Sequence, residues 1–352
     1  RHVDAALSRE ATRLSDLVRR RARHAERHGP SPARPGTVED VAGAELAWVS
    51  FVEVGERLLA LRVVAGAVSV IELGEMQAAR HEASLLRGVL AMHLNALGRG
   101  VSRDPEAVVR SAAIADALLM EPLDLPPGPV VVSPIAGLHD LPWGLLPSLS
   151  SRPFVIAPSV ALWKRCALRP AGRHGRVTVA AGPSLALAAA EAERVASCHQ
   201  WPTVLTGDEA TVARVGAQLA GADVVHLVCH GQFSRENPMF SSLRMADGPM
   251  FVYDLERVAP PPAVVVLSAC HAGSHATPTG REILGLTASL LATGPRSVIA
   301  GTVPIPDTLA TVEVMTTLHT ALAAGIGPAD ALHRARAVDP IVAGAFAAHG
   351  AH

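Results

Sequence analysis

Short apolar segments alternate with helical patterns from residue 129 onward, and this alternation limits the possible folds more than any other feature of the sequence. The segments run PVVVSP (129–134), FVIAP (154–158), RVTVAAG (176–182), TVLTG (203–207), DVVHLVC (223–229), AVVVLSA (263–269) and RSVIAGT (296–302). Continuously apolar strands separated by helices are typical of a mostly parallel sheet that is covered on both faces. The sequence therefore predicts an α/β fold with a mostly parallel sheet flanked by helices on both faces.

Helices are expected between these strands and after the last of them. Their patterns cover about 185–197, 210–220, 281–294, 307–324 and 328–337, and the last two are expected to close the chain. Ser159 is a candidate cap for a helix after strand 154–158, and SSLRMADGPMFVYD (241–254) predicts a hairpin between strands 223–229 and 263–269. Upstream, residues 45–74 predict two or three strands with turns at Gly55 and near Gly66. Helical patterns at 75–98 and about 104–119 follow. Strands in both α/β parts of the chain, residues 41–175 and 176–352, indicate two similar lobes.

The sequence divides into three parts. Residues 1–40 form a basic helical lead-in, LSDLVRRRARHAERHG, and a Pro/Gly linker, GPSPARPG. The basic helix is either a solvated face or a junction to a further domain. Residues 41–175 and 176–352 are the two α/β parts. Because the chain begins with Arg1 and not Met, we expect that an upstream portion has been removed.

Composition excludes several classes of protein. Apolar residues make up 49% of the 352 and charged residues 18%, which is typical of a globular chain. The net charge of −1 gives no reason to expect binding to nucleic acid or a membrane surface. No signal-peptide pattern and no long apolar run is present, and the four cysteines are widely spaced, so we expect a cytoplasmic protein with reduced thiols.

A histidine and a cysteine follow two of the apolar strands. His230 comes directly after strand 223–229, and Cys270 after strand 263–269. Functional groups collect at the carboxyl ends of parallel strands, so neighbouring strands would bring the two residues together. A thiolate can attack a carbonyl while an imidazole moves the proton. Gly231 lets the backbone approach a substrate, and the amides of Gly231 and Cys270 are candidate donors to an oxyanion.

Several motifs resemble those of a known family. VVHLVCHGQF (224–233) and VVVLSACHAG (264–273) are similar to the His-Gly and Ala-Cys-x-x-Gly boxes of the caspase-like (clan CD) cysteine peptidases. The chain more narrowly resembles the CHAT domain family, a branch of that clan often fused to tetratricopeptide repeats. The further matching stretches are VVVSPIAGLHDLPWGLLP (130–147), APSVALW (157–163) and GREILGLTASLLATGPRSVIAGTVPIPD (280–307). The resemblance covers about 45–352.

The resemblance implies a caspase-like fold with a degenerate N-terminal lobe and an active C-terminal lobe. It implies that His230 is the general base or acid, that Cys270 is the nucleophile and that no cofactor is needed. It also implies regulated proteolysis of a protein or peptide substrate, in defence or cell-death signalling, switched by an upstream sensor or repeat domain or by a regulatory protein. Such enzymes often carry an acidic residue two before the cysteine, where this chain has Ser268, so a basic P1 preference is not implied. We expect Asp307 to cap the helix that follows it, rather than to line the cleft.

Other readings of the reactive residues remain open. His226 is expected to be a hydrogen-bonded core histidine rather than a catalytic alternative, Cys229 a core residue, and His139 structural. The His and Cys spacing fits no compact zinc site, and GPSLALAAAEAE (182–193) lacks the Lys-Ser/Thr of a phosphate loop. The alternatives to an endopeptidase are a non-catalytic scaffold or signalling module of the same fold, and a small-molecule thiol hydrolase with a closed pocket.

Overall fold

The computed structural model describes residues 37–42, 44–172, 175–232, 238–270 and 280–352. The predicted basic helix and linker lie outside these ranges. Residues 37–352 form one compact unit. The strands are β1 (Ala47–Val54), β2 (Arg57–Val64), β3 (Ala67–Glu75), β4 (Val130–Ser133), β5 (Phe154–Ile156), β6 (Val177–Ala181), β7 (Pro202–Leu205), β8 (Val224–Gln232), β9 (Ser242–Met245), β10 (Gly248–Phe251), β11 (Val264–Cys270), β12 (Ser297–Gly301) and β13 (Phe346–Gly350).

Helices connect most of the parallel strands. The α-helices are α2 (Val38–Ala42), α3 (Met76–Gly98), α4 (Glu106–Leu119), α5 (Pro147–Ser150), α6 (Val160–Ala167), α7 (Ala188–Ala196), α8 (Val212–Leu219), α9 (Val252–Leu255), α10 (Gly280–Thr293), α11 (Leu309–Ala323), α12 (Pro328–Ala335) and α13 (Pro340–Gly344). Short 3₁₀ turns are η1 (Glu121–Leu123), η2 (Trp143–Leu145), η3 (Gly207–Glu209) and η4 (Pro238–Phe240). None of the described helices is both long and apolar enough to cross a bilayer.

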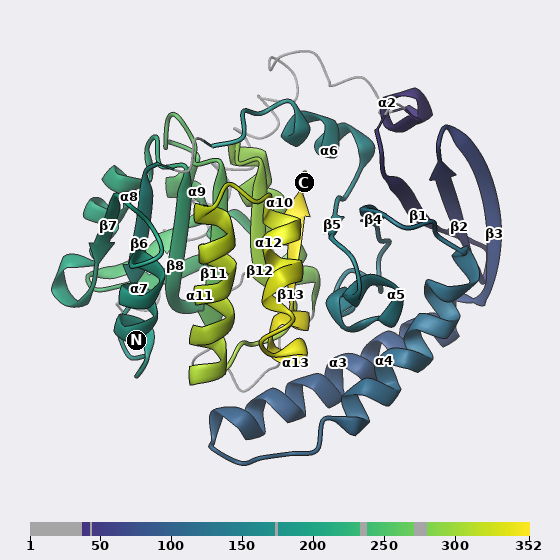
Figure 1. The fold of residues 1–352 in the computed structure, drawn as a ribbon, viewed down its shortest axis with the longest axis horizontal. Coiled ribbons are helices and arrows are strands. Elements are labelled where there is room, and N and C mark those ends of the chain that lie inside the picture. The colour runs from purple at the N-terminus through teal and green to yellow at the C-terminus, as the bar shows by residue number, and fades with distance from the viewer. Residues whose placement is uncertain (1–36, 43, 173–174, 233–237, 271–279) are drawn as a thin grey trace, which may run out of the picture. The chain divides into compact units, whose positions relative to one another are not determined.

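One sheet runs through the whole unit (Figure 1). Its central order is β7-β6-β8-β11-β12-β13-β5-β4-β1-β2-β3, and β9 and β10 extend from the end of β8 as a hairpin. The pairs from β7 to β12 are parallel, and so are those from β13 to β1. Strands β4, β5 and β6 are buried along their full length, as expected of strands covered on both faces. The predicted mostly parallel α/β sheet, flanked by helices, is confirmed.

The turns and caps that the sequence predicts near the edges are present. Gly55 and Gly66 both have positive φ, +62° and +79°, at the β1–β2 and β2–β3 turns. Ser159 caps α6 as expected, because its hydroxyl accepts a hydrogen bond from the backbone N–H of Leu162 at 3.2 Å. The predicted hairpin between the two parallel strands is the pair β9–β10.

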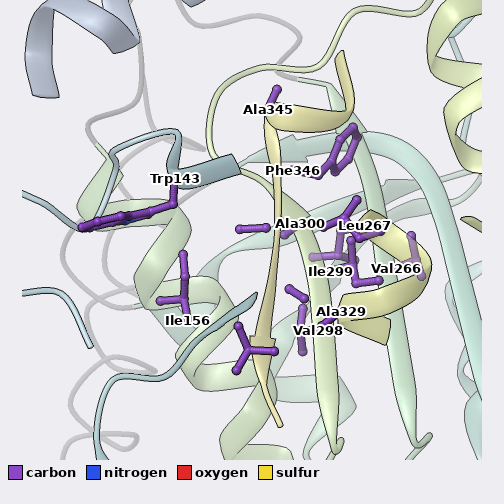
Figure 2. Close-up of a cluster of buried hydrophobic side chains, with 14 of the residues drawn as sticks. Trp143, Ile156, Val266, Leu267, Val298, Ile299, Ala300, Ala329, Ala345 and Phe346 are labelled. Carbon is purple, nitrogen blue, oxygen red and sulfur yellow. The ribbon is translucent and has the colours of Figure 1, made fainter. Parts of the chain in front are cut away.

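The end of the chain differs from expectation. The sequence predicts that helices close the chain, but β13 follows α13 and pairs antiparallel with β12 and parallel with β5. Phe346 and the alanines of β13 are fully buried. Figure 2 shows Phe346 gathered with Ile299 and Ala300 of β12 in the core around this strand. Alanine is uncommon in strands, so the sequence did not predict a strand at β13. Packing against the neighbouring strands outweighs the low strand propensity of alanine here.

The two α/β parts, 41–175 and 176–352, therefore share a sheet that is continuous across them. Strand β13 belongs in sequence to the second part and lies beside β5 of the first. The three-part division of the chain stays a prediction.

Candidate active site

The ends of β8 and β11 define the candidate site. The two strands are parallel neighbours in the sheet (Figure 1). Their register places Cys270 directly opposite His230. Adjacent strands lie about 4.8 Å apart, so the two backbones are close at the carboxyl edge of the sheet. The sequence left open whether these strands are neighbours, and their pairing shows that they are. The roles of the two residues stay predictions.

The imidazole of His230 has one ring nitrogen engaged and one free. The ring is half-buried, and Nε2 donates a hydrogen bond to the backbone carbonyl of Ser184 at 3.2 Å. Nδ1 is buried and has no hydrogen-bond partner among the described residues. A carbonyl can only accept, so this contact assigns the proton to Nε2 and leaves the lone pair on Nδ1. A buried ring nitrogen without a partner costs about 1–3 kcal/mol, and such groups call for a functional explanation.

The loop after β6 supplies the carbonyl that orients His230. Ser184 has φ of +69°, in the left-handed region that non-glycine residues seldom adopt. Backbone strain of this kind costs of order 1–3 kcal/mol and clusters at functional sites. Ser184 is not among the residues predicted from the sequence. The Gly-Pro-Ser turn directly after a buried strand could have indicated it, since such turns place backbone groups at the strand ends.

Gly182 fixes this loop against the His230 strand. Its N–H donates to the Val228 carbonyl at 2.7 Å. A Cβ at Gly182 would lie 2.7 Å from the Cβ of Cys229 and closer still to the carbonyl oxygen of Arg244. Only a residue without a side chain allows the three segments to approach this closely.

The Gly182→Ala variant is expected to lose about 1–3 kcal/mol of unfolding free energy, because the added methyl group must displace backbone on both sides. Chemical denaturation measures the change. The matched control is Gly216→Ala in α8, where a Cβ meets no atom within 4 Å and a gain of roughly 0.5–1 kcal/mol is expected from helix propensity. Equal effects of the two substitutions would contradict the packing argument.

Gly231 lies between the candidate histidine and the β9 hairpin. It is buried, and its register partner in β9 is Leu243. The oxyanion role of the Gly231 and Cys270 amides stays a prediction.

A small recess lies beside the candidate dyad, with about 210 Å³ of empty space. It is lined by Leu185, Glu191, Val228, Ser268, Ile305, Pro306, Asp307 and Thr311. Val228 and Ser268 come two residues before His230 and Cys270, so the recess adjoins the two strand ends. Both of its acidic groups already accept hydrogen bonds from the protein.

Asp307 has a different role from the one predicted. The cap of α11 is Thr308, whose hydroxyl accepts from the backbone N–H of Thr311 at 3.4 Å. The Asp307 carboxylate instead accepts from the backbone N–H of Leu187, at 3.2 and 3.3 Å, before the start of α7. The prediction that Asp307 caps the following helix is therefore wrong. The residue one position later takes that place, and Asp307 joins the β12–α11 loop to the β6–α7 loop.

A chain of buried hydrogen bonds runs beneath the site. His226 Nε2 contacts Glu191 Oε1 at 2.9 Å, and His226 Nδ1 contacts His319 Nε2 at 3.1 Å. His319 Nδ1 in turn contacts His199 Nε2 at 3.0 Å. Burial and the two neighbouring histidines lower the pKa of His319 well below its ordinary value. His226 is thus a satisfied core histidine, as predicted, and the chain ties α7 and α11 to β8.

Two other cysteines are poor nucleophiles. Cys229 is fully buried, and burial raises the pKa of its thiol to about 12. Burial also raises the pKa of Cys166 on α6. The thiolate is the reactive form, so both thiols are unreactive near neutral pH. The described residues hold no group of three or more His, Cys, Asp or Glu side chains that could bind a metal ion.

The segment that contains His139, within the family-like stretch 130–147, is held by contacts that are structural. His139 contacts the backbone carbonyl of Pro134 at 3.0 Å, and Asp140 pairs with Arg87 of α3. The chain has no cysteine before Cys166. The predicted structural role of His139 agrees with these contacts.

The comparisons with known proteins agree on the class of fold. Two structures of the Saccharomyces cerevisiae separase–securin complex match with TM-scores of 0.60 and 0.61 at 8% identity. Each match covers 89% of this chain and 30% of the other, so this chain spans under a third of that protein. The fold is caspase-like. No curated protein sequence matches the chain significantly.

The sequence model of the CHAT domain matches residues 109–338, which is more than half of the chain. The chain therefore belongs to the CHAT domain family, and the predicted family is confirmed.

Proposed function

We propose that this CHAT domain is a cysteine endopeptidase in which Cys270 is the nucleophile and His230 is the general base and acid. The observation that carries the proposal is the register that sets Cys270 opposite His230 at the carboxyl edge of the sheet. The contact from His230 to the Ser184 carbonyl supports it, because it leaves Nδ1 free to accept a proton.

The chemistry needs only these residues and water. His230 Nδ1 takes the proton of the Cys270 thiol, and the thiolate attacks the scissile carbonyl carbon. The amides of Gly231 and Cys270 stabilise the oxyanion. The C–N bond breaks, His230 returns the proton to the leaving amine, and a thioester remains. A water molecule then gives one proton to His230 and adds its hydroxyl to the thioester carbon, the C–S bond breaks, and His230 returns the proton to the departing thiolate.

The recess beside the dyad favours a peptide over a small enclosed substrate. Pockets that enclose a whole small molecule measure roughly 300–1,000 Å³, whereas the cavity volume of this recess is about 10 Å³, room for roughly one water molecule. It does not enclose a small-molecule substrate. Glu191 and Asp307 already bind His226 and the Leu187 N–H. We therefore propose a neutral P1 side chain rather than arginine.

The biological setting is part of the same proposal. Membership of the CHAT family supports regulated cleavage of a protein, in defence or cell-death signalling, under control of an upstream sensor or repeat domain. Separase is bound by the protein securin in the matched structures, and we propose that a protein partner likewise controls this domain. A cytoplasmic location remains part of the proposal.

The test is the rate at which a peptidyl acyloxymethyl ketone labels Cys270, followed by intact mass and peptide mapping. The wild-type chain is expected to be labelled at Cys270 at least about 100-fold faster than at Cys198, because a neighbouring base supplies thiolate. A probe with leucine at P1 is expected to react faster than one with arginine. Cys270→Ala should remove the fast labelling.

Cys198→Ala is the matched control and should leave the fast phase unchanged. If Cys270 is labelled no faster than Cys198 with either probe, the endopeptidase proposal fails and the scaffold alternative takes its place.

A further inference from the structure

A groove unrelated to the candidate dyad lies between the first half of the unit and its last helices. It has about 1230 Å³ of empty space. One wall is α4 with η2 and α5, and the other is α12 with α13. Its lining includes two arginines and a histidine but no acidic side chain.

Arg336 lies at the buried side of the groove, and no carboxylate of the described residues pairs with it. The residue is 7% exposed, its guanidinium lies 4.9 Å from the Phe154 ring centroid, and Nη1 donates to the carbonyls of Leu149 and Arg152. Its Nε is buried and has no hydrogen-bond partner within the described ranges. Burial lowers its pKa to about 10, which still leaves the cation fully charged at neutral pH. Buried charges in proteins are normally paired, so this cation calls for an anionic ligand.

His333, three residues earlier on α12, offers the complementary group. Its ring forms a hydrogen bond with the backbone of Ser150, and Nδ1 is buried without a partner in the part of the chain that the structure describes. Burial and the neighbouring Arg336 lower the pKa of His333, so the ring is neutral at pH 7. The groove therefore has one unpartnered acceptor, His333 Nδ1, beside one unpartnered donor, Arg336 Nε. A peptide backbone supplies both partners, and a fatty acid anion supplies no donor.

The outer part of the groove is apolar and carries further positive charge. Val109 of α4 is 55% exposed in the wall, and Ile341 and Leu145 lie deeper. Arg334 is exposed at the rim and makes no ion pair with any described residue. The nearby buried carboxylate of Asp116 is engaged by Ser148. The charge of the groove is therefore positive and its walls are apolar.

We propose that this groove binds a short segment of a protein partner in which an acidic residue is flanked by apolar side chains. The carboxylate pairs with Arg334 and Arg336, the apolar side chains pack on Val109 and Ile341, and a backbone N–H donates to His333. The proposal does not depend on the proposed peptidase activity.

The experiment is selection of phage-displayed random dodecapeptides on the whole chain, followed by fluorescence polarisation with the enriched peptides. The expected peptides have Asp or Glu between apolar residues, and Arg334→Glu weakens their binding at least tenfold. Val109→Asp is expected to do the same. Ile114→Asp is the matched control, because Ile114 is also 55% exposed on α4 and does not line the groove. Arg99→Glu controls for the change of charge, and both controls should stay within twofold.

Two results would overturn the proposal. Enriched peptides that bind the Val109→Asp and Ile114→Asp variants equally well do not use this groove. The second result is that no acidic–apolar peptides are enriched, while palmitate binds the wild-type chain but not the Arg334→Glu variant. This result would assign the groove to a small amphipathic anion instead.

Discussion

The His230→Ala variant is expected to label at Cys270 about 10²–10⁴-fold more slowly than the wild-type chain, the range typical of a lost general base. His230 Nδ1 is the ring nitrogen that stays free to take a proton, because the Ser184 carbonyl holds the hydrogen of Nε2. Without the imidazole, the thiol ionises only at its own pKa, about 8.5 for an ordinary cysteine.

The pH profile separates loss of a base from loss of structure. In the wild-type chain the labelling rate should level off near neutral pH, whereas in His230→Ala it should still rise through about pH 8.5. The control is His81→Ala, an exposed residue of α3, which should leave rate and profile unchanged. A His230→Ala chain that unfolds with wild-type free energy and is labelled at the wild-type rate would rule out the dyad.

Acidification is expected to destabilise the protein strongly through His349. Its ring lies in the centre of the sheet, where β13 pairs with Val298 of β12 and Ile156 of β5. Neither ring nitrogen has a hydrogen-bond partner among the described residues. Burial lowers the pKa of His349 from 6.5 to about 4.

The direction of the pH effect follows from that shift. Below pH 6.5 the unfolded chain binds a proton at His349, and the folded chain does not until about pH 4. Stability contributed by the neutral ring is therefore complete above pH 6.5 and is lost as the pH falls towards 4. At 1.36 kcal/mol per pKa unit, His349 alone removes about 2 kcal/mol of unfolding free energy between pH 7 and pH 5. His352, with a pKa lowered to about 4 by burial, acts in the same direction.

The His349→Met variant tests this effect by chemical denaturation at pH 7 and pH 5. Methionine fills a similar volume without a group that titrates. Between pH 7 and pH 5 the free energy of unfolding of the variant should therefore fall by about 2 kcal/mol less than that of the wild type. At pH 7 it should be more stable by about 1–3 kcal/mol, because no polar ring is left unsatisfied. His81→Gln should keep the wild-type pH dependence. An unchanged pH dependence in His349→Met would show that the buried ring does not titrate in this way.

The sequence predicts the local elements well where the pattern is strong. The fully apolar strands, the hairpin between β8 and β11 and the cap at Ser159 follow from burial, turn chemistry and capping, which act over a few residues. The segment between β8 and β11 is long enough for the crossover that a parallel pair requires, but only the structure shows that the two strands are neighbours.

What the sequence misses depends on contacts between distant residues. Strand β13 is short and rich in alanine, and only its neighbours β12 and β5 make it a strand. Asp307 was predicted to bind the helix next to it, but it binds Leu187, 120 positions away. The link from His226 to His319 likewise spans 93 positions. The Ser184 carbonyl is a backbone group, so only the Gly-Pro-Ser turn that contains it marks its place in the sequence.

The central place of β13 constrains the order of events during synthesis. It is the last strand of the unit to be made, and the sheet cannot close across the gap between β12 and β5 before it arrives. Until then a nascent chain carries two unpaired strand edges, and such edges readily pair with other chains. The sheet therefore depends on residues 346–350 for its continuity, and the same residues of a second copy are the natural competitor for that gap.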